Sequence, residues 1–253
     1  MNVLVCVKRV PLTGGKIVLT PDERAIETRH LGFAISPHEE CAAEEAVRLV
    51  EQHGGLSAVL TLGPPEAEEQ LRDVMAIGVD RALHLVAGEG ERDPQATAAA
   101  IVDAVRAEAE PFDLLMFGNE SADAGNYQVA IRVAYGLGLP CVTGVKGLTV
   151  EDGSIRCEQE VPGGRDIYVV PMPAVVTVKE GLNLPRYPSV PGRLRAKKKP
   201  VVTGSPAERD AKLEMVRLVL PPGTGKQTEI LGNGPEAAPG VLAMMRDLGL
   251  VRQ

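Results

Sequence analysis

Four short segments combine small, polar and charged residues at places where a fold could bring them together. Cys6 to Arg9, Leu62 to Gly63 and Gly118 to Asn126 each follow an apolar run. Ser36 to Glu39 indicates a capped helix start, because Ser and Glu stand three residues apart around a proline. Ligands of doubly wound sheets bind beyond the carboxyl ends of the strands, and helix N-termini offer free N–H groups to phosphate. These segments therefore predict a nucleotide site.

The usual fingerprints of nucleotide-dependent enzymes are missing from the sequence. No G-x-G-x-x-G follows the first apolar run, which disfavours a dinucleotide-binding Rossmann domain. Gly223–Gln227 resembles the end of a P-loop, but Leu220 stands where the leading Gly belongs. The pattern therefore favours a binding or carrier role over catalysis.

Residues for catalysis or metal binding do not form a persuasive set. Asn119, Glu120 and Asp123 could be metal ligands, but a polar turn that caps a helix explains them more simply. His38 lies in the first turn of the capped helix, where a surface residue is commoner than a catalyst. Cys6, in an apolar strand, is typical of a core. We predict no catalytic residue and no metal site.

Alternating strands and helices must position these segments. In the first 140 residues, short apolar runs alternate with helix-like stretches, which is typical of a parallel sheet with crossover helices. The apolar runs have the pattern of strands buried on both faces. The expected strands are Val3–Val7, Leu56–Leu62, Arg81–Val86 and Phe112–Phe117, and the expected helices cover 36–53, 66–77, 93–109 and 126–139.

The rest of the chain has a different character. Residues 142–178 are rich in β-branched side chains, with turn signals at Asp152-Gly153 and Gly163-Gly164, and predict an antiparallel meander or hairpin. From Gly181 onward Pro, Gly and charge dominate, with short elements at 208–220 and 238–251. The expected fold is α/β, a doubly wound, mostly parallel sheet with added antiparallel strands and an extended C-terminal arm for a partner subunit.

One basic, proline-spaced segment stands out from an acidic chain of formal net charge −7. It runs from Pro185 to Pro200 and carries five positive charges between Arg193 and Lys199. Binders of single-stranded nucleic acid interleave such charge with aromatic rings, but this chain has three Phe, four Tyr and no Trp. We therefore expect no nucleic acid here. A P-x-x-P ligand is the other interpretation of the segment, with a merely solvated surface as the alternative for Lys197–Lys199.

Cysteine usage and hydropathy bear on the compartment. The four cysteines are widely spaced without a C-x-x-C pair, as in reducing surroundings. No apolar run approaches the ~20 residues of a membrane span, and we find no secretory signal. We expect a cytoplasmic protein with no direct membrane insertion.

Several quoted stretches resemble a known family. "VLVCVKRVP" from Val3, "EEAVRL", "TLGP", the spacing Gly118-x4-Asp123, "PAVVTV" and above all "LNLPRYPSVPGRLRAKKKP" are similar to the β subunit of electron transfer flavoprotein. The resemblance runs from Val3 to about Lys199 and is weaker beyond it. The combination N-x-P-R-Y with a following Lys run is its most specific part.

The resemblance implies a fold of the adenine-nucleotide α-hydrolase-like, Rossmann-like type and a role without catalysis of its own. The β subunit pairs with an α subunit that holds the redox-active FAD, and itself binds AMP structurally. The heterodimer carries electrons from flavin dehydrogenases, typically the acyl-CoA dehydrogenases of fatty acid β-oxidation, to a membrane quinone oxidoreductase. The expected parts are a nucleotide-binding domain at 1–184, a partner recognition loop at 185–200 and an arm at 201–253 that packs on the α subunit.

The family's AMP contacts fall on the segments already singled out. Two positions depart from the animal pattern: Ser36 stands where Asn is common, and His38 where an aromatic residue approaches the flavin. The implied cofactor-binding residues are Cys6, Ser36, Pro37, His38, Glu39, Leu62, Gly118, Asn119, Glu120, Ser121, Ala122, Asp123, Ala124, Gly125, Asn126, Tyr127, Gln128 and Val129.

The resemblance also gives the basic segment a role. In the family this loop docks on the dehydrogenase through one apolar side chain, which corresponds to Val190 between two prolines. The implied docking residues are Tyr187, Pro188, Ser189, Val190 and Pro191. The prolines stiffen the loop and so lower the ordering cost of binding.

Two alternatives stay open at this point. The chain could be the β subunit of an electron-bifurcating relative, with a second FAD at the AMP position. It could also be an unrelated adenine-nucleotide-binding protein or hydrolase. The number of flavins per heterodimer would distinguish the first alternative from an AMP-binding subunit. ATP turnover by the isolated chain would favour the second.

Overall fold

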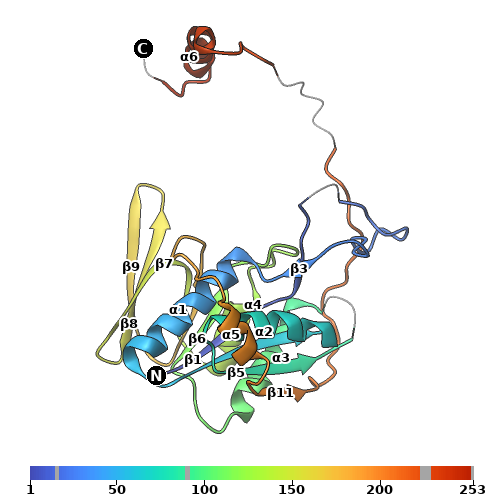
Figure 1. The fold of residues 1–253 in the computed structure, drawn as a ribbon, viewed down its shortest axis with the longest axis vertical. Coiled ribbons are helices and arrows are strands. Elements are labelled where there is room, and N and C mark those ends of the chain that lie inside the picture. Colours follow the sequence, from blue (N-terminus) through green and yellow to red (C-terminus); the bar gives the residue numbers. More distant parts are fainter. Residues whose placement is uncertain (15–16, 89–91, 223–228, 252–253) are drawn as a thin grey trace. The chain divides into compact units, whose positions relative to one another are not determined.

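The apolar runs form the strands of a nine-stranded sheet, in the order β11-β5-β4-β1-β6-β10-β7-β8-β9 (Figure 1). The computed structural model describes residues 1–14, 17–88, 92–222 and 229–251. The strands are β1 (Asn2–Cys6), β4 (Leu56–Gly63), β5 (Arg81–Val86), β6 (Leu114–Gly118), β7 (Cys141–Glu151), β8 (Ser154–Val161), β9 (Gly164–Pro171), β10 (Ala174–Val178) and β11 (Val201–Gly204). Besides the sheet, β2 (Val10–Pro11) and β3 (Phe33–Ala34) form a short antiparallel pair.

The parallel part of the sheet is doubly wound, as predicted. From β1 the chain moves outward through β4 to β5 and then returns to place β6 on the other side of β1. β1 pairs in parallel with both neighbours, with Val5 level with Val59 of β4 and Met116 of β6. The strand order therefore reverses between β1 and β6.

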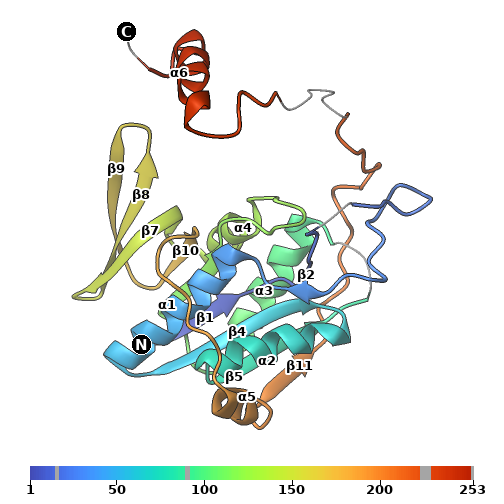
Figure 2. The same cartoon turned by 45° about the horizontal axis from the view of Figure 1, so that its top comes forward.

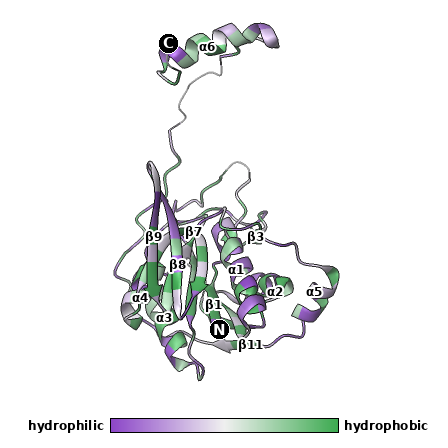
Figure 3. Cartoon of the chain, turned by 90° about the vertical axis from the view of Figure 1, so that its left-hand side faces the viewer, coloured by the Kyte–Doolittle hydropathy of each residue, from purple (hydrophilic) through white to green (hydrophobic). Residues whose placement is uncertain are grey.

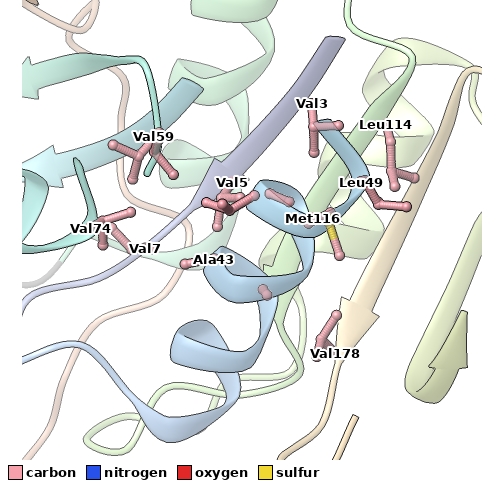
Figure 4. Close-up of a cluster of buried hydrophobic side chains, with 14 of the residues drawn as sticks. Val3, Val5, Val7, Ala43, Leu49, Val59, Val74, Leu114, Met116 and Val178 are labelled. Atoms are coloured by element: carbon pink, nitrogen blue, oxygen red, sulfur yellow. The ribbon is translucent and has the colours of Figure 1, made fainter. Parts of the chain in front are cut away.

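Helices cover both faces of this sheet (Figure 2). They are α1 (Pro37–His53), α2 (Glu68–Ile77) after the 3₁₀ turn η1 (Pro65–Ala67), α3 (Pro94–Ala107) and α4 (Val129–Leu137). Alternate residues of each strand face opposite helix layers, because successive side chains of a strand point to opposite sides. Val3, Val5 and Met116 pack with α1 and α2 (Figure 4), whereas Leu4, Leu115 and Phe117 pack with α3 and α4.

Burial on both faces explains why the strand runs are continuously apolar. Val3, Leu4 and Val5 are fully buried, as are Leu114 and Met116. The helices α1 and α2 instead mix hydrophobic and hydrophilic residues along their length (Figure 3), since only one side of each meets the sheet. No helix in the described part of the chain combines the length and apolarity that a bilayer crossing requires.

The antiparallel addition is present, with one correction. β7, β8 and β9 form the expected meander, with turns at the two predicted Gly-containing sites. The last run, "PAVVTV", does not continue it: β10 inserts between β6 and β7 and pairs in parallel with both. Its five residues are all buried, so it is a core strand of the parallel sheet.

Three predicted details of the second half also differ from the structure. Val201–Gly204, assigned to the arm, forms the edge strand β11 parallel to β5. The expected loop at 185–200 contains a short helix, α5 (Val190–Ala196). Residues 208–220 form neither helix nor strand. Domain boundaries at 184 and 200 stay predictions.

Residues 218–253 form a separate unit. It holds the 3₁₀ turn η2 (Pro235–Ala237) and α6 (Ala238–Asp247), where the sequence predicted its last element. None of the residues in η2 or α6 is buried. The P-loop-like Gly223–Gln227 lies outside the described residues.

Candidate functional site

A cavity of about 380 Å³ lies at the carboxyl ends of the parallel strands, at the switch point between β1 and β6. The ends of β1, β4 and β6 contribute Cys6, Leu62 and Gly118 to its lining. The convergence of strand ends that the sequence predicted is therefore present.

Most of the predicted binding residues line this cavity. They are Cys6, Glu39, Leu62, Gly118, Asn119, Glu120, Ser121, Asp123, Asn126, Tyr127, Gln128 and Val129. The other six, which are absent from the lining, are Ser36, Pro37, His38, Ala122, Ala124 and Gly125.

Ser36 lies behind the lining and joins the segments to each other. Its hydroxyl oxygen accepts a hydrogen bond from the Ala122 N–H at 2.9 Å, across 86 residues of sequence. Glu39 accepts one from the Ser36 N–H and another from the Lys8 N–H, both at 2.9 Å. The predicted capping residues thus fix the start of α1, the end of β1 and the loop after β6 in one frame.

The carboxyl group of Glu39 is buried at the cavity wall. Burial raises its pKa to about 8. Two backbone hydrogen bonds and the charge of Lys8 act in the opposite direction, but burial has the larger effect. Asp123, also in the lining, forms an ion pair with Lys8 at 2.7 Å. Burial raises the pKa of Asp123, but Lys8 outweighs this effect and the net pKa is lowered. At neutral pH we expect Glu39 to be mostly protonated and Asp123 ionised.

Gly118 allows β6 to end directly against α1. A Cβ at this position would lie 2.7 Å from Glu39 Cγ and 3.3 Å from the Glu39 backbone nitrogen. Such a contact is closer than packed atoms tolerate, so a side chain here would displace the start of α1. The small residue predicted at the strand end is a steric requirement of the site.

The loop after β6 is held from both sides. Thr177, at the end of β10, donates its hydroxyl hydrogen to Asn119 Oδ1 at 2.7 Å and accepts from the Gly144 N–H. Farther along the loop, Tyr127 has a left-handed backbone with φ of 56°. This conformation is unfavourable for a residue with a side chain and occurs mostly where surrounding structure imposes it, often at binding sites.

Sequence reasoning missed Arg92, Thr97 and Thr177, which also line the cavity. Thr177 was missed because the β10 run was assigned to an antiparallel meander, so its end was not placed with the other strand ends. Arg92 directly precedes Asp93, whose carboxylate accepts from the Ala96 N–H at the start of α3. A basic residue beside a helix N-cap was the signal that could have found it.

Two arginines line the cavity alongside the acidic residues Glu120 and Asp123. Arg9 and Arg92 both line it, and Arg9 Nε and Arg92 Nη1 are buried without a hydrogen-bond partner among the described residues. The guanidinium group of Arg9 also stacks on the Phe33 ring, 3.3 Å from its centroid. Buried donors of this kind normally have a partner, so they fit an anionic group in the cavity.

The chemistry of catalysis or of metal binding is not apparent in these residues. The described residues contain no cluster of three or more His, Cys, Asp or Glu that could hold a metal ion. Cys6 lines the cavity, but burial raises the pKa of its thiol, so it stays protonated and unreactive. The arrangement can bind a ligand with an anionic end.

The basic segment forms a second feature, on the α1/α2 side of the molecule. Ser189 caps α5 by accepting from the Gly192 N–H at 3.1 Å. Next to it, Tyr187 and Val190 are 96% and 73% exposed. We call Tyr187–Pro191 the docking segment, after the role that the sequence predicts for it.

Part of the basic run serves the fold instead of a partner. Lys199 Nζ donates to the carbonyl oxygens of Met75, Gly78 and Val79, at and beyond the C-terminal end of α2. Arg193 forms an ion pair with Asp73 of the same helix at 3.1 Å. For Lys199, the alternative of a merely solvated surface is wrong.

Comparison with known proteins gives consistent matches. The family model described as electron transfer flavoprotein domain matches residues 25–209. The chain is 32% identical to the electron transfer flavoprotein subunit beta of Bacillus subtilis, over 97% of this chain and 98% of that protein. It is 35% identical to the subunit of the same name from Syntrophomonas wolfei, over 88% and 86% of the two chains, and 30% identical to the human one, over 99% of each.

These matches exclude the alternative of an unrelated nucleotide-binding protein. They cover nearly the whole chain, well beyond the segments quoted for the resemblance. The chain therefore belongs to the family of electron transfer flavoprotein β subunits.

Proposed function

We propose that this chain is the β subunit of a heterodimer that carries electrons from flavin dehydrogenases, such as acyl-CoA dehydrogenases, to a membrane quinone oxidoreductase. The redox-active FAD belongs to the α subunit, near the interface. The chain itself is a carrier subunit in the cytoplasm and performs no catalysis. The names of its relatives, each a subunit beta, support a partner subunit.

The cavity at the β1–β6 switch point is the proposed AMP site. The observation that carries this assignment is the pair of buried, unpartnered donors, Arg9 Nε and Arg92 Nη1, in a cavity with mixed polar and apolar walls. AMP presents a doubly charged phosphate, which suits arginine. Val129 and Ala130 in the first turn of α4 also line the cavity, and the free N–H groups of a helix start favour an anion.

The other predicted contacts would surround the rest of the nucleotide. Cys6, Leu62 and Val129 supply apolar surface, and Asn126 and Gln128 supply polar groups from the loop. AMP contributes no redox chemistry. Its role is structural: it fills the cavity and neutralises charge that the fold would otherwise bury unpaired.

The docking segment is the proposed contact with the dehydrogenase. Its exposed Val190 is the apolar anchor, held between two prolines that limit the conformations lost on binding. A single apolar anchor implies a small interface, which suits a carrier that must leave each partner quickly.

Cofactor stoichiometry tests the proposal. The purified heterodimer is denatured, and the released nucleotides are separated and counted against protein. We expect one AMP and one FAD per heterodimer. Two FAD and no AMP would support the electron-bifurcating alternative. If the heterodimer released neither AMP nor FAD, the assignment of the cavity would be overturned.

The arginine pair gives a matched second test. Arg92→Met removes one of the two unpartnered donors and should lower AMP retention through gel filtration. Arg165→Met, on the β9 strand and paired with Glu158, is the control and should retain AMP as the wild type does. Equal retention in all three proteins would mean that Arg92 does not bind the phosphate.

A further inference from the structure

The chain just before the docking segment is fastened to helix α1 by long-range hydrogen bonds. Asn183 Nδ2 donates to the Cys41 carbonyl oxygen and to Glu45 Oε2, both at 2.9 Å. Arg48 donates to the Leu184 carbonyl oxygen at 3.3 Å. These contacts join residues about 140 positions apart in sequence, so they hold the segment in the tertiary structure instead of forming a local turn.

Arg186 makes the strongest of these attachments. Its backbone N–H and its guanidinium group both bind the Glu44 carboxylate, with Nε 2.9 Å from Oε2 and Nη2 3.1 Å from Oε1. The same guanidinium forms a fork to Glu51, with Nη1 2.7 Å from Oε1 and Nη2 3.0 Å from Oε2. Glu44 and Glu51 are seven residues apart, two turns of α1, so one planar guanidinium bridges one face of the helix.

Glu44 is the buried centre of this network. Its side chain is 2% exposed and also accepts from Arg48 Nε at 2.7 Å. Burial raises the pKa of Glu44, but the hydrogen bonds from Arg186 outweigh it and the net pKa is lowered. A buried carboxylate tolerates only a geometry in which its partners stay in place, so it restricts where Arg186 can lie.

The docking segment is fastened on its other side as well. Gly192 sits against α2, where a Cβ would lie 2.4 Å from the Ala76 carbonyl oxygen. Lys199 then binds the end of α2 through three carbonyl oxygens. The exposed Tyr187 and Val190 thus stand between two fixed points, on α1 and on α2.

We propose that Glu44 is a positioning residue for partner docking: acting through Arg186, it holds the docking segment in its binding-competent conformation before the partner arrives. This inference rests on the proposed function of that segment. A chain that is ordered in advance loses less conformational entropy on binding, so the gain appears in partner affinity and not in the electron-transfer step.

The test measures steady-state electron transfer from a purified acyl-CoA dehydrogenase, reduced by its acyl-CoA substrate, to the intact heterodimer. Glu44→Gln should raise the KM for the heterodimer by about tenfold, while kcat at saturation stays within about twofold. Glu158→Gln is the matched control: Glu158 also binds two arginines, Arg156 and Arg165, but on the β8–β9 hairpin. It should leave KM and kcat unchanged.

A second variant covers the case in which Glu44→Gln does not fold. Arg186→Lys keeps the positive charge between the two carboxylates but lacks the planar fork, and should raise KM in the same direction by a smaller factor. AMP and FAD content is measured for every variant and should match the wild type.

Val190→Ala separates failure of this inference from failure of the proposed function. If Val190→Ala raises KM but Glu44→Gln and Arg186→Lys do not, the positioning role is overturned while the docking segment stands. If Val190→Ala leaves KM unchanged, the docking assignment itself is wrong. A fall in kcat with unchanged KM for Glu44→Gln would also overturn the positioning role.

Discussion

The cavity at the β1–β6 switch point and the docking segment differ in what holds their residues in place. The cavity is built on buried strand ends, and its segments are joined through hydrogen bonds that involve backbone N–H groups, from Ser36, Lys8 and Ala122. The docking segment lies on the surface, and charged contacts hold the chain on either side of it: Arg186 binds Glu44 of α1, and Lys199 binds backbone carbonyl oxygens at the end of α2. A change at the cavity should therefore disturb the fold, whereas a change within the docking segment should disturb binding alone.

The pH dependence of stability is the largest effect expected on the cavity side. The pKa of Glu39 is about 8 in the folded protein, against an ordinary value of 4.5. Between these values the folded state keeps a proton that the unfolded state has released, so the contribution of Glu39 to the free energy of unfolding is fully present below about pH 4.5 and is lost as the pH rises to about 8. The slope is up to ~1.4 kcal/mol per pH unit.

Glu39→Gln should remove this slope, because an amide does not change its charge in this pH range. It should also lower the free energy of unfolding by a constant amount, because the amide cannot accept both backbone hydrogen bonds. Unfolding midpoints measured from pH 5 to 9 give the comparison. Glu160→Gln is the control: the hydrogen bond from Lys146 lowers the pKa of Glu160, so its charge does not change in this range. A wild-type slope that persists in Glu39→Gln would show that Glu39 is ionised in the folded protein.

Gly118→Ala should give the next largest effect. The new methyl group meets Glu39 Cγ at 2.7 Å, and the start of α1 must shift to accept it. We expect a loss of about 2 kcal/mol in the free energy of unfolding, together with loss of AMP. Gly164→Ala, at a position with no atom within 4 Å of the added methyl group, is the matched control for denaturant unfolding and nucleotide content. Equal stability of the two variants would contradict the steric role of Gly118.

Lys199→Met tests the comparison between fold and docking at a residue that lies in the basic run of the sequence but binds the end of α2. The variant keeps the length of the side chain but leaves three carbonyl oxygens without their charged donor. We expect a loss of about 1.5 kcal/mol in unfolding free energy. Lys198→Met changes an exposed neighbour and should have no measurable effect. Similar stability of both variants would mean that the contacts of Lys199 contribute nothing.

Val190→Ala should have the smallest effect on the fold and a clear effect on function. Its side chain is 73% exposed, so the unfolding free energy should change by less than about 0.5 kcal/mol. Electron transfer from the dehydrogenase should slow at subsaturating concentration, with flavin content unchanged. A destabilised Val190→Ala protein would break the proposed separation between fold and docking.

Much of the fold and of the site could be predicted from local patterns. The Ser36–Glu39 capping signal and the apolar runs are encoded within a few residues, and the structure contains both the helix start and the strands. The rule that ligands bind at strand ends is sufficient to predict from sequence that Cys6, Leu62 and Gly118 lie together. The errors lie where pairing is non-local: β10 and β11 were misplaced because a short apolar run does not specify its neighbours.

By itself, the sequence determined the alternation of strands and helices, the helix caps and the position of the proline-spaced basic segment, since propensity, capping and proline act over a few residues. Only the tertiary structure decided what the charges do. Glu44, Arg186 and Lys199 look like surface residues in the sequence, yet each is bound to a partner far along the chain. Charges act through distance in space, and only the folded chain sets that distance.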